Sequence, residues 1–274
     1  METKQKQEES KKISYGKAHP NYGLVDEFIL PDGKRVMIRD RNGEDEEFIT
    51  RVGDAKIGKS LFNFLARIIV EHEDFKTKPI TPTDVANFKS KCIYYMILRS
   101  RLLAFGPVLK FDFEWPGLPK SITYEEDLSK YDWDLSNPVP GKDSKEYFEH
   151  RITPYLNASE LKRTIKLTSS KQVRYTHLTG NAEVELVALK QDDYTSNTEF
   201  KFRSLELKRD NVNEWQQIQN FREFTARDMA EIRKDIKLYD STFTAISDIP
   251  HPNNQDKTQI SLLAQPDFLF PRDL

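Results

Sequence analysis

This chain of 274 residues has one cysteine, Cys92, and five scattered histidines. A single cysteine excludes an intrachain disulfide and a cysteine-based zinc site. The histidines form no HxxxH pair and no His-Asp-Ser arrangement at catalytic spacing, so they indicate neither a metal centre nor a hydrolase triad. Cys92 falls inside an apolar helical pattern, where we expect a buried thiol rather than a reactive one.

The sequence also lacks an excess of charge of one sign and a long hydrophobic run. The net charge is −2 although 31% of the residues are charged, so the composition shows no preference for nucleic acid or an anionic membrane. The most apolar stretch, residues 57–70, is too short and too polar to span a bilayer, and the N-terminus lacks the apolar core of a signal peptide. We therefore expect a soluble protein of a cytoplasm-like compartment, with no membrane span and no direct nucleic-acid contact.

One pattern that is present occurs twice. LPDGKRV at residues 30–36 and LTSSKQV at residues 167–173 each indicate strand, tight turn and strand, and Leu, Lys, Val, Gly and Glu recur at a constant offset of 137 residues (34 to 171). A capping box at residues 81–84, and another at residues 225–228, opens an amphipathic helix downstream of each hairpin. A repeated ribbon-and-helix unit is typical of a scaffold, and it predicts an internal duplication.

These patterns predict an α+β fold of two similar lobes, each with a β-hairpin, amphipathic helices and a closing β-ribbon. Residues 1–20 are polar and are expected to form a disordered or partner-docked arm. Residues 21–144 are expected to form the first lobe with a linker at its end, and residues 145–274 the second lobe with an aromatic C-terminal tail.

Apolar spacing predicts the elements within each lobe. In the first lobe we expect one helix from Ile57 through Ile69, another from Pro82 to Phe105, and a ribbon strand over residues 108–115. In the second lobe we expect a hairpin over 164–178, helical segments over 180–189 and 200–224, a capped helix, and a last ribbon with strands 243–246 and 258–262.

Residues 53–60 match the phosphate-binding pattern GxxxxGK[ST] in full, and the defining positions of this P-loop-like segment are Gly53, Gly58, Lys59 and Ser60. On pattern alone these residues would bind the phosphates of ATP or GTP. A P-loop follows a buried parallel strand, however, and here only residues 48–52 separate an acidic stretch from the first glycine. We therefore favour a glycine-containing helix start with exposed lysines, and we expect no cofactor.

The C-terminal segment Phe268, Leu269, Phe270 and Pro271 is unusually aromatic for a chain end and supplies the candidate partner-binding residues. Prolines on both sides favour an extended conformation with both phenylalanine rings on one face. Two interpretations stay open. The segment either folds back onto the second lobe or inserts into a partner, as interface anchors do.

Four strings resemble the T4-type baseplate hub and hub-assembly family of contractile-tailed bacteriophages. They are LPDGKRVMIRDRNGEDEEFITR, YYMILRSRLLAFGPVLKFDFEWPG, KLTSSKQVRYTHLTGNAEVEL and the closing FLFP. The resemblance implies a structural or assembly factor at the tail tip, near the hub and the tape-measure protein. Many relatives carry Cys-Pro-x-Cys knuckles where this chain has residues 115–117 and 249–252. A metal knuckle is thus excluded here, and we expect packing of Trp115 and Ile249 to close the ribbons.

The sequence therefore predicts a non-enzymatic component of a phage tail baseplate or hub. Its expected location is the virion, and the host cytoplasm during assembly. Its expected partners are other tail and baseplate hub proteins of a multi-subunit assembly. Two alternatives stay open, a transient tail-assembly chaperone that binds the tape-measure protein and a P-loop nucleotide-binding protein.

Overall fold

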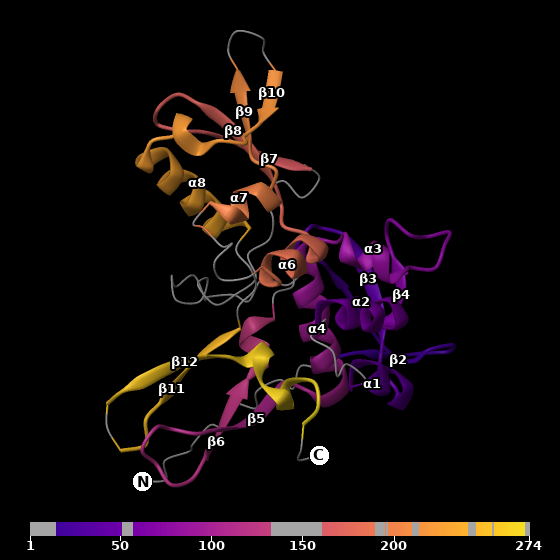
Figure 1. Ribbon diagram of the computed structural model, residues 1–274. Helices are drawn as coiled ribbons and strands as arrows, with labels where there is room; N and C mark the ends of the chain where they lie inside the picture. The colour runs from indigo at the N-terminus through magenta and orange to yellow at the C-terminus, as the bar shows by residue number, and fades with distance from the viewer. Residues whose placement is uncertain are drawn as a thin grey trace, which may run out of the picture.

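The computed structural model describes residues 15–50, 57–132, 161–189, 195, 197–209, 214–240, 245–253 and 255–271 (Figure 1). Helices and short antiparallel strands mix along these segments, so the fold is α+β, as predicted. The described strands form two four-stranded sheets and two two-stranded ribbons. In Figure 1 the sheet of strands β7 to β10 lies at the top, and the ribbons β5–β6 and β11–β12 lie at the bottom.

The first sheet has the order β1–β2–β3–β4, with bounds Lys17–His19, Gly23–Ile29, Arg35–Arg39 and Ile69–His72. The β2–β3 hairpin is the predicted one, and Gly33 fits its turn because its φ of 84° lies in the left-handed region. The expected disorder of residues 1–20 is wrong for β1, because backbone pairing with β2 orders these residues despite their polar side chains. Residues 1–14 lie outside the described residues.

The first-half helices are α1 (Gly43–Thr50), α2 (Ile57–Ile68), α3 (Pro82–Ala86) and α4 (Ser90–Phe105). The prediction that the first helix includes Ile69 is wrong, because Ile69 begins β4 and pairs with Ile38 of β3.

The predicted single helix from Pro82 to Phe105 is also wrong, since it breaks between α3 and α4. At the break, the Ser90 N–H donates to the Leu178 carbonyl (2.8 Å) and the Gly180 N–H donates to the Phe88 carbonyl (3.0 Å). Pairing with a distant part of the chain therefore replaces the helical hydrogen bonds there.

Helix α4 is the centre of the larger buried cluster. Most of its residues are buried, including Cys92 as predicted, and burial raises the pKa of that thiol. The cluster also contains residues of the first sheet, α2 and the strand β5 (Val108–Phe113), which pairs with β6 (Ile122–Asp127) and leads to the 3-10 turn η1 (Leu128–Tyr131).

The second sheet has the order β7–β8–β9–β10, with bounds Lys162–Lys166, Gln172–Thr176, Glu206–Arg209 and Glu214–Gln217. The accompanying helices are α6 (Gly180–Val187), α7 (Thr198–Phe202), α8 (Ala226–Tyr239) and the 3-10 turn η3 (Phe221–Glu223). The predicted hairpin and the helix over residues 180–189 are confirmed. The predicted helical segment over 200–224 is wrong, because β9 and β10 occupy much of it and Leu205 and Leu207 are buried at strand spacing.

The last ribbon consists of β11 (Ile246–Pro250) and β12 (Lys257–Ser261), followed by the 3-10 turns η4 (Leu262–Ala264) and η5 (Pro266–Phe268). It begins later than predicted, and residues 241–244 lie outside the described residues. The ribbon does not close the second lobe. Its buried residues join the cluster around α4, whereas the smaller cluster consists of second-sheet, α7, η3 and α8 residues. The predicted boundary near residue 145 therefore separates the two sheets but does not separate the two cores.

The two halves share several element bounds. β3, α1 and β4 begin and end 137 positions before β8, α6 and β9 (35 to 172, 43 to 180, 69 to 206). The hairpin turns also match, since the Leu30 N–H donates to the Lys34 carbonyl and the Leu167 N–H donates to the Lys171 carbonyl, both at 2.8 Å. Both predicted capping boxes are present. The duplication itself stays a prediction, because similar elements do not establish common descent.

Candidate protein-contact site

The P-loop-like segment has a different context from that of a phosphate-binding loop. Gly58, Lys59 and Ser60 lie in the first turn of α2, and Gly53 lies outside the described residues. Residues 43–50 before it form helix α1, whereas a P-loop follows a parallel strand. The strand that follows α2, β4, pairs antiparallel with β3.

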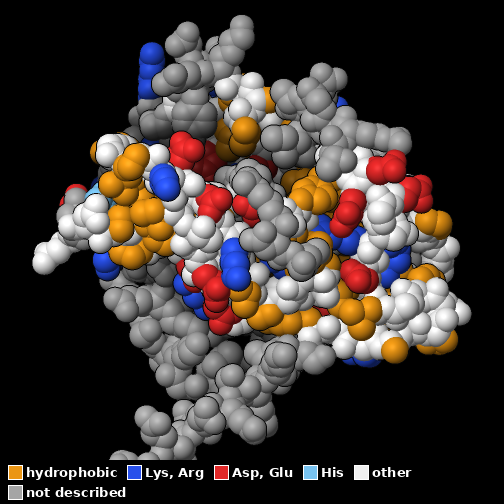
Figure 2. Space-filling view, turned by 90° about the horizontal axis from the view of Figure 1, so that it is seen from below, with side chains coloured by type: hydrophobic (Ala, Val, Ile, Leu, Met, Phe, Trp, Pro, Cys, Tyr) orange, Lys and Arg blue, Asp and Glu red, His pale blue; other side chains and the backbone are white. Residues whose placement is uncertain are grey.

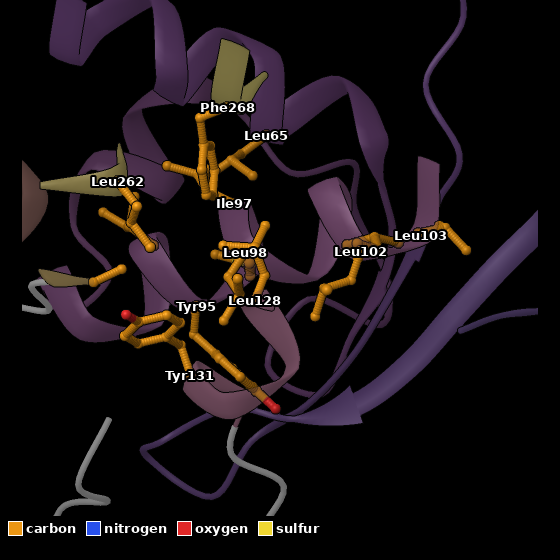
Figure 3. Packing of buried hydrophobic residues seen from close by; sticks show 14 of the residues in the cluster. Leu65, Tyr95, Ile97, Leu98, Leu102, Leu103, Leu128, Tyr131, Leu262 and Phe268 are labelled. Carbon is orange, nitrogen blue, oxygen red and sulfur yellow. The ribbon is translucent and has the colours of Figure 1, made fainter. Parts of the chain in front are cut away.

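The C-terminal segment is not extended, so that prediction is wrong. The Phe268 N–H donates to the Gln265 carbonyl (3.0 Å), which closes the turn η5, and Pro266 is tolerated because the first position of such a turn needs no N–H donor. Phe268 is 1% exposed and points into the larger cluster beside Leu65 and Ile97 (Figure 3). The Phe268 side chain thus folds back onto the protein, as the first of the two interpretations expected. It packs against the first half of the chain, however, and not against the second lobe. Phe268 is therefore a core residue in this conformation, and one side of it lines a pocket beside the segment.

Leu269, Phe270 and Pro271 are half-buried, and Arg41 contacts the first two. The Arg41 Nη2–H group donates a hydrogen bond to the Leu269 carbonyl. The Arg41 guanidinium also lies 5.5 Å from the centre of the Phe270 ring and 4.2 Å from the centre of the Phe105 ring. Arg41 thus joins the C-terminal segment to α4.

A second buried arginine lies on the same aromatic ring. The Arg101 guanidinium is 4.9 Å from the centre of the Phe105 ring and donates to the Gly106 and Val108 carbonyls, both at 2.9 Å. Burial and the nearby charge of Arg41 lower the pKa of Arg101 to about 10. Burial likewise lowers the pKa of Arg41. Arg41 Nε lies 3.5 Å from a Glu46 carboxylate oxygen, whereas Arg41 Nη1 and Arg101 Nε are buried without a hydrogen-bond partner in the described structure.

A pocket of about 250 Å³, here called the C-terminal pocket, lies beside this segment. Its walls include Ile49 of α1, Leu61 of α2, Tyr94 and Ile97 of α4, and Phe268 with Leu269. Ser60 also lines it, so the structure brings one residue of the P-loop-like segment next to the C-terminal segment. Burial and the Glu183 carboxylate raise the pKa of Tyr94 and keep it a neutral phenol. A pocket of mostly apolar, partly exposed side chains suits an apolar side chain of another protein.

Sequence reasoning missed Ile49, Tyr94 and Leu61 as site residues. They lie on three different helices, and each belongs to an apolar pattern that a core also requires. Only the packing of α1, α2 and α4 around the C-terminal segment distinguishes them from core residues.

The two ribbons meet where the resemblance implies cysteine knuckles in relatives. Trp115 and Ile249 are 8% and 2% exposed, so the predicted packing of these two residues is observed. The Trp115 Nε1–H donates to the Tyr124 hydroxyl (2.7 Å), which donates to the Pro250 carbonyl (2.8 Å). The Trp115 and His251 rings also meet edge to face at 4.6 Å. Aromatic and hydrogen-bond contacts thus join the two ribbon ends.

Within the described ranges, no group of three or more His, Cys, Asp or Glu residues has the arrangement of a metal site. Among the same residues, no helix has the length and apolar character needed to cross a bilayer. No family model, curated protein or solved structure matches this chain.

Proposed function

We propose that this protein is a structural or assembly component of a contractile phage tail that acts at the baseplate or hub through protein–protein contacts. The observation that carries the proposal is the C-terminal pocket, whose apolar walls remain partly exposed beside a segment that Arg41 holds in place. Apolar concave surfaces of this kind are what partner side chains fill at interfaces.

The family resemblance supports the same proposal. Its four strings fall on the two hairpins with the helices that follow them, on α4 with β5, and on the C-terminal segment. These are the elements that build the scaffold. Figure 2 shows acidic, basic and hydrophobic side chains interspersed on the face seen from below, which is not the one-sign surface typical of nucleic-acid binding.

The test is a stoichiometric protein analysis of purified tails assembled with the wild type or with Leu61→Arg, which places a charge in the C-terminal pocket. We expect the wild type at a fixed copy number and incorporation of Leu61→Arg reduced by about tenfold or more, as for loss of an interface anchor. The matched control is Leu238→Arg on α8, a leucine that is 51% exposed and does not line the pocket. Circular dichroism of each variant confirms that it folds.

Other outcomes separate the alternatives. A chaperone is absent from purified tails but recovered with the tape-measure protein from infected cells. A nucleotide-binding protein is stabilised against heat by ATP or GTP, and Lys59→Ala abolishes that stabilisation. Equal incorporation of Leu61→Arg and the wild type contradicts the role of the pocket.

A further inference from the structure

Strand β4 lies at one end of the first sheet, whereas the corresponding strand β9 has a further neighbour. The orders are β1–β2–β3–β4 and β7–β8–β9–β10. β4 and β9 correspond at both ends (69 to 206, 72 to 209). In the second sheet β10 pairs with the outer edge of β9, whereas the same edge of β4 has no further strand among the described residues. β9 is as short as β4 and still pairs with β10 along its whole length, so a short edge is no obstacle to pairing.

Backbone direction agrees with this correspondence. The Ile218 N–H donates to the Leu205 carbonyl (2.8 Å), so the backbone groups of Leu205 point toward the strand β10. Every second residue of a strand points its backbone groups to the same side, so those of Arg209 also point toward β10. In the first sheet the Glu73 N–H donates to the Arg35 carbonyl (3.0 Å), so the backbone groups of Glu73 point toward β3. Those of the neighbouring residue His72 therefore point away from β3, toward the outer edge of β4. The His72 carbonyl accepts the Phe75 N–H (3.0 Å), and the His72 N–H faces the edge.

A groove of about 620 Å³ extends from β2 across β3 to this edge, with Glu27, Met37, Val70, Glu71 and Phe75 among its walls. Met37 corresponds to Arg174 (37 to 174), whose guanidinium lies 4.5 Å from the centre of the Trp215 ring of β10. Trp215 lies opposite Lys208, which corresponds to Glu71 (71 to 208), and Glu71 pairs with Met37, so a strand added to β4 in the same way would place a side chain opposite Glu71 and in line with Met37. Methionine sulfur makes favourable contacts with aromatic rings, so an aromatic side chain suits that position.

Glu27, Glu71 and Glu73 line the groove together with Arg35 and Lys76. Arg35 forms an ion pair with Glu27 (3.3 Å), so the charge that remains near β4 favours a basic strand. Glu27 pairs with Lys17 (2.6 Å), and a Glu73 oxygen accepts the Arg35 backbone N–H (3.1 Å). The Glu71 side chain is exposed, and its carboxylate makes no hydrogen bond or ion pair within the described structure, whereas its backbone pairs with Met37 of β3. An unpaired carboxylate on an edge strand repels acidic strands and attracts lysine or arginine on a strand opposite.

We propose that the β4 edge binds an extended segment of a partner protein, added antiparallel to β4, with an aromatic side chain opposite Glu71 in line with Met37 and a lysine or arginine two residues away on the same face, diagonal to the Glu71 carboxylate. Backbone hydrogen bonds supply affinity in this mode of recognition, and the side chains supply specificity. The register shift between Met37 and Ile38 and the charge of Glu71 disfavour pairing of two identical edges, so a second copy of the chain is not the occupant. The inference rests on the proposed contact role only in that both require a protein partner.

The test measures binding of two synthetic peptides to the full chain by fluorescence anisotropy. One peptide has a tryptophan with a lysine two residues to each side, on the same face, in a β-branched background, and the other has glutamates in place of the lysines. We expect the lysine peptide to bind at least about tenfold more tightly. Glu71→Lys should reverse the preference, so that the glutamate peptide binds more tightly. The control Glu125→Lys changes the net charge by the same amount at an exposed position of β6 and should preserve the preference for the lysine peptide. Hydrogen exchange of the His72 amide should slow when the lysine peptide binds.

Equal binding of the two peptides, an unchanged preference in Glu71→Lys, or an unprotected His72 amide would each overturn the proposal. A concentration-dependent dimer of the wild type that Glu71→Lys disrupts would also overturn it, because a second copy would then occupy the edge. Peptide binding uses only the purified chain. Failure at the β4 edge is therefore distinguishable from absence of the protein in purified tails, which refutes the phage role alone.

Discussion

The two halves of the chain join helix to sheet by ion pairs of opposite polarity. In the first half, Asp26 of β2 accepts two hydrogen bonds from Arg99 of α4, both at 2.8 Å. In the second half, Arg163 of β7 lies 137 positions after Asp26 (26 to 163) and donates to Asp235 of α8 at 2.6 and 2.7 Å. The geometry is alike and the charges are exchanged. Each half thus has a bidentate strand-to-helix ion pair, and the carboxylate comes from the strand in the first half and from the helix in the second.

The surroundings of the two pairs differ. Arg99 and Asp26 have side chains 8% and 6% exposed, and Arg99 also contacts Asp132 at 3.2 Å. Arg163 and Asp235 are 19% and 15% exposed. The ribbons and the C-terminal segment pack in the cluster around α4, whereas the second cluster contains neither. The first pair is therefore a core interaction, and the second is a partly hydrated one.

The largest expected difference between the halves follows from this burial. Asp26→Ala should lower the free energy of unfolding by about 3–5 kcal/mol, because it leaves the Arg99 charge buried without its main partner. Asp235→Ala should cost about 1.5–3 kcal/mol, the value for charged hydrogen bonds, since Arg163 reaches water. Denaturant unfolding of both variants checks this, and equal losses contradict the difference in burial.

The first residues of α1 and α6 offer a matched pair with a smaller effect. A Cβ at Gly180 would lie 2.3 Å from Ile93 Cδ1 and 2.8 Å from Phe62 Cε1, whereas a Cβ at Gly43 meets no atom within 4 Å. Gly180→Ala should therefore cost about 1–3 kcal/mol through overpacking between the halves. Gly43→Ala should be neutral or stabilise by up to about 1 kcal/mol by restricting the unfolded chain. Thermal unfolding of both variants decides, and a costly Gly43→Ala would contradict the open surroundings of α1.

The smallest expected effect at neutral pH is a pH slope from His177 in the second half, which grows as the solution is acidified. Its imidazole is buried, and burial with the charges of Lys89 and Arg203 lowers its pKa to about 3. Asp240 lies 3.0 Å away and acts in the opposite direction, but Arg203 and the Leu178 N–H already engage that carboxylate, so the lowering dominates.

The unfolded chain binds a proton at His177 near pH 6.5 and the folded chain does not until about pH 3. Stability should therefore fall as pH falls through this window, by up to about 1.4 kcal/mol per pH unit. Denaturant unfolding as a function of pH should show a shallower slope for His177→Asn. His19→Asn, in the β1–β2 hairpin, is the control, and an unchanged slope in His177→Asn would contradict the assignment.

The candidate site shows why its parts were only partly predictable. The aromatic C-terminal segment and the P-loop-like segment each stand out in the sequence, but no local pattern says that Ser60 and Leu269 line one pocket. Phe268 and Phe270 look equivalent in the sequence, yet one ring is buried against Leu65 and the other lies near Arg41. Such contacts depend on residues about two hundred positions away.

The sequence alone determined the features whose interactions span only a few residues. The hairpin turns at Leu30–Lys34 and Leu167–Lys171 and the capping boxes at Thr81 and Thr225 form as predicted, because their donors and acceptors are near neighbours in the chain. Only the tertiary structure decided where α2 ends, where α3 and α4 separate, and which core receives the last ribbon. At each of these places a distant segment supplies the competing hydrogen bonds or apolar contacts, and these outweigh a helical pattern that is worth less than 1 kcal/mol per residue.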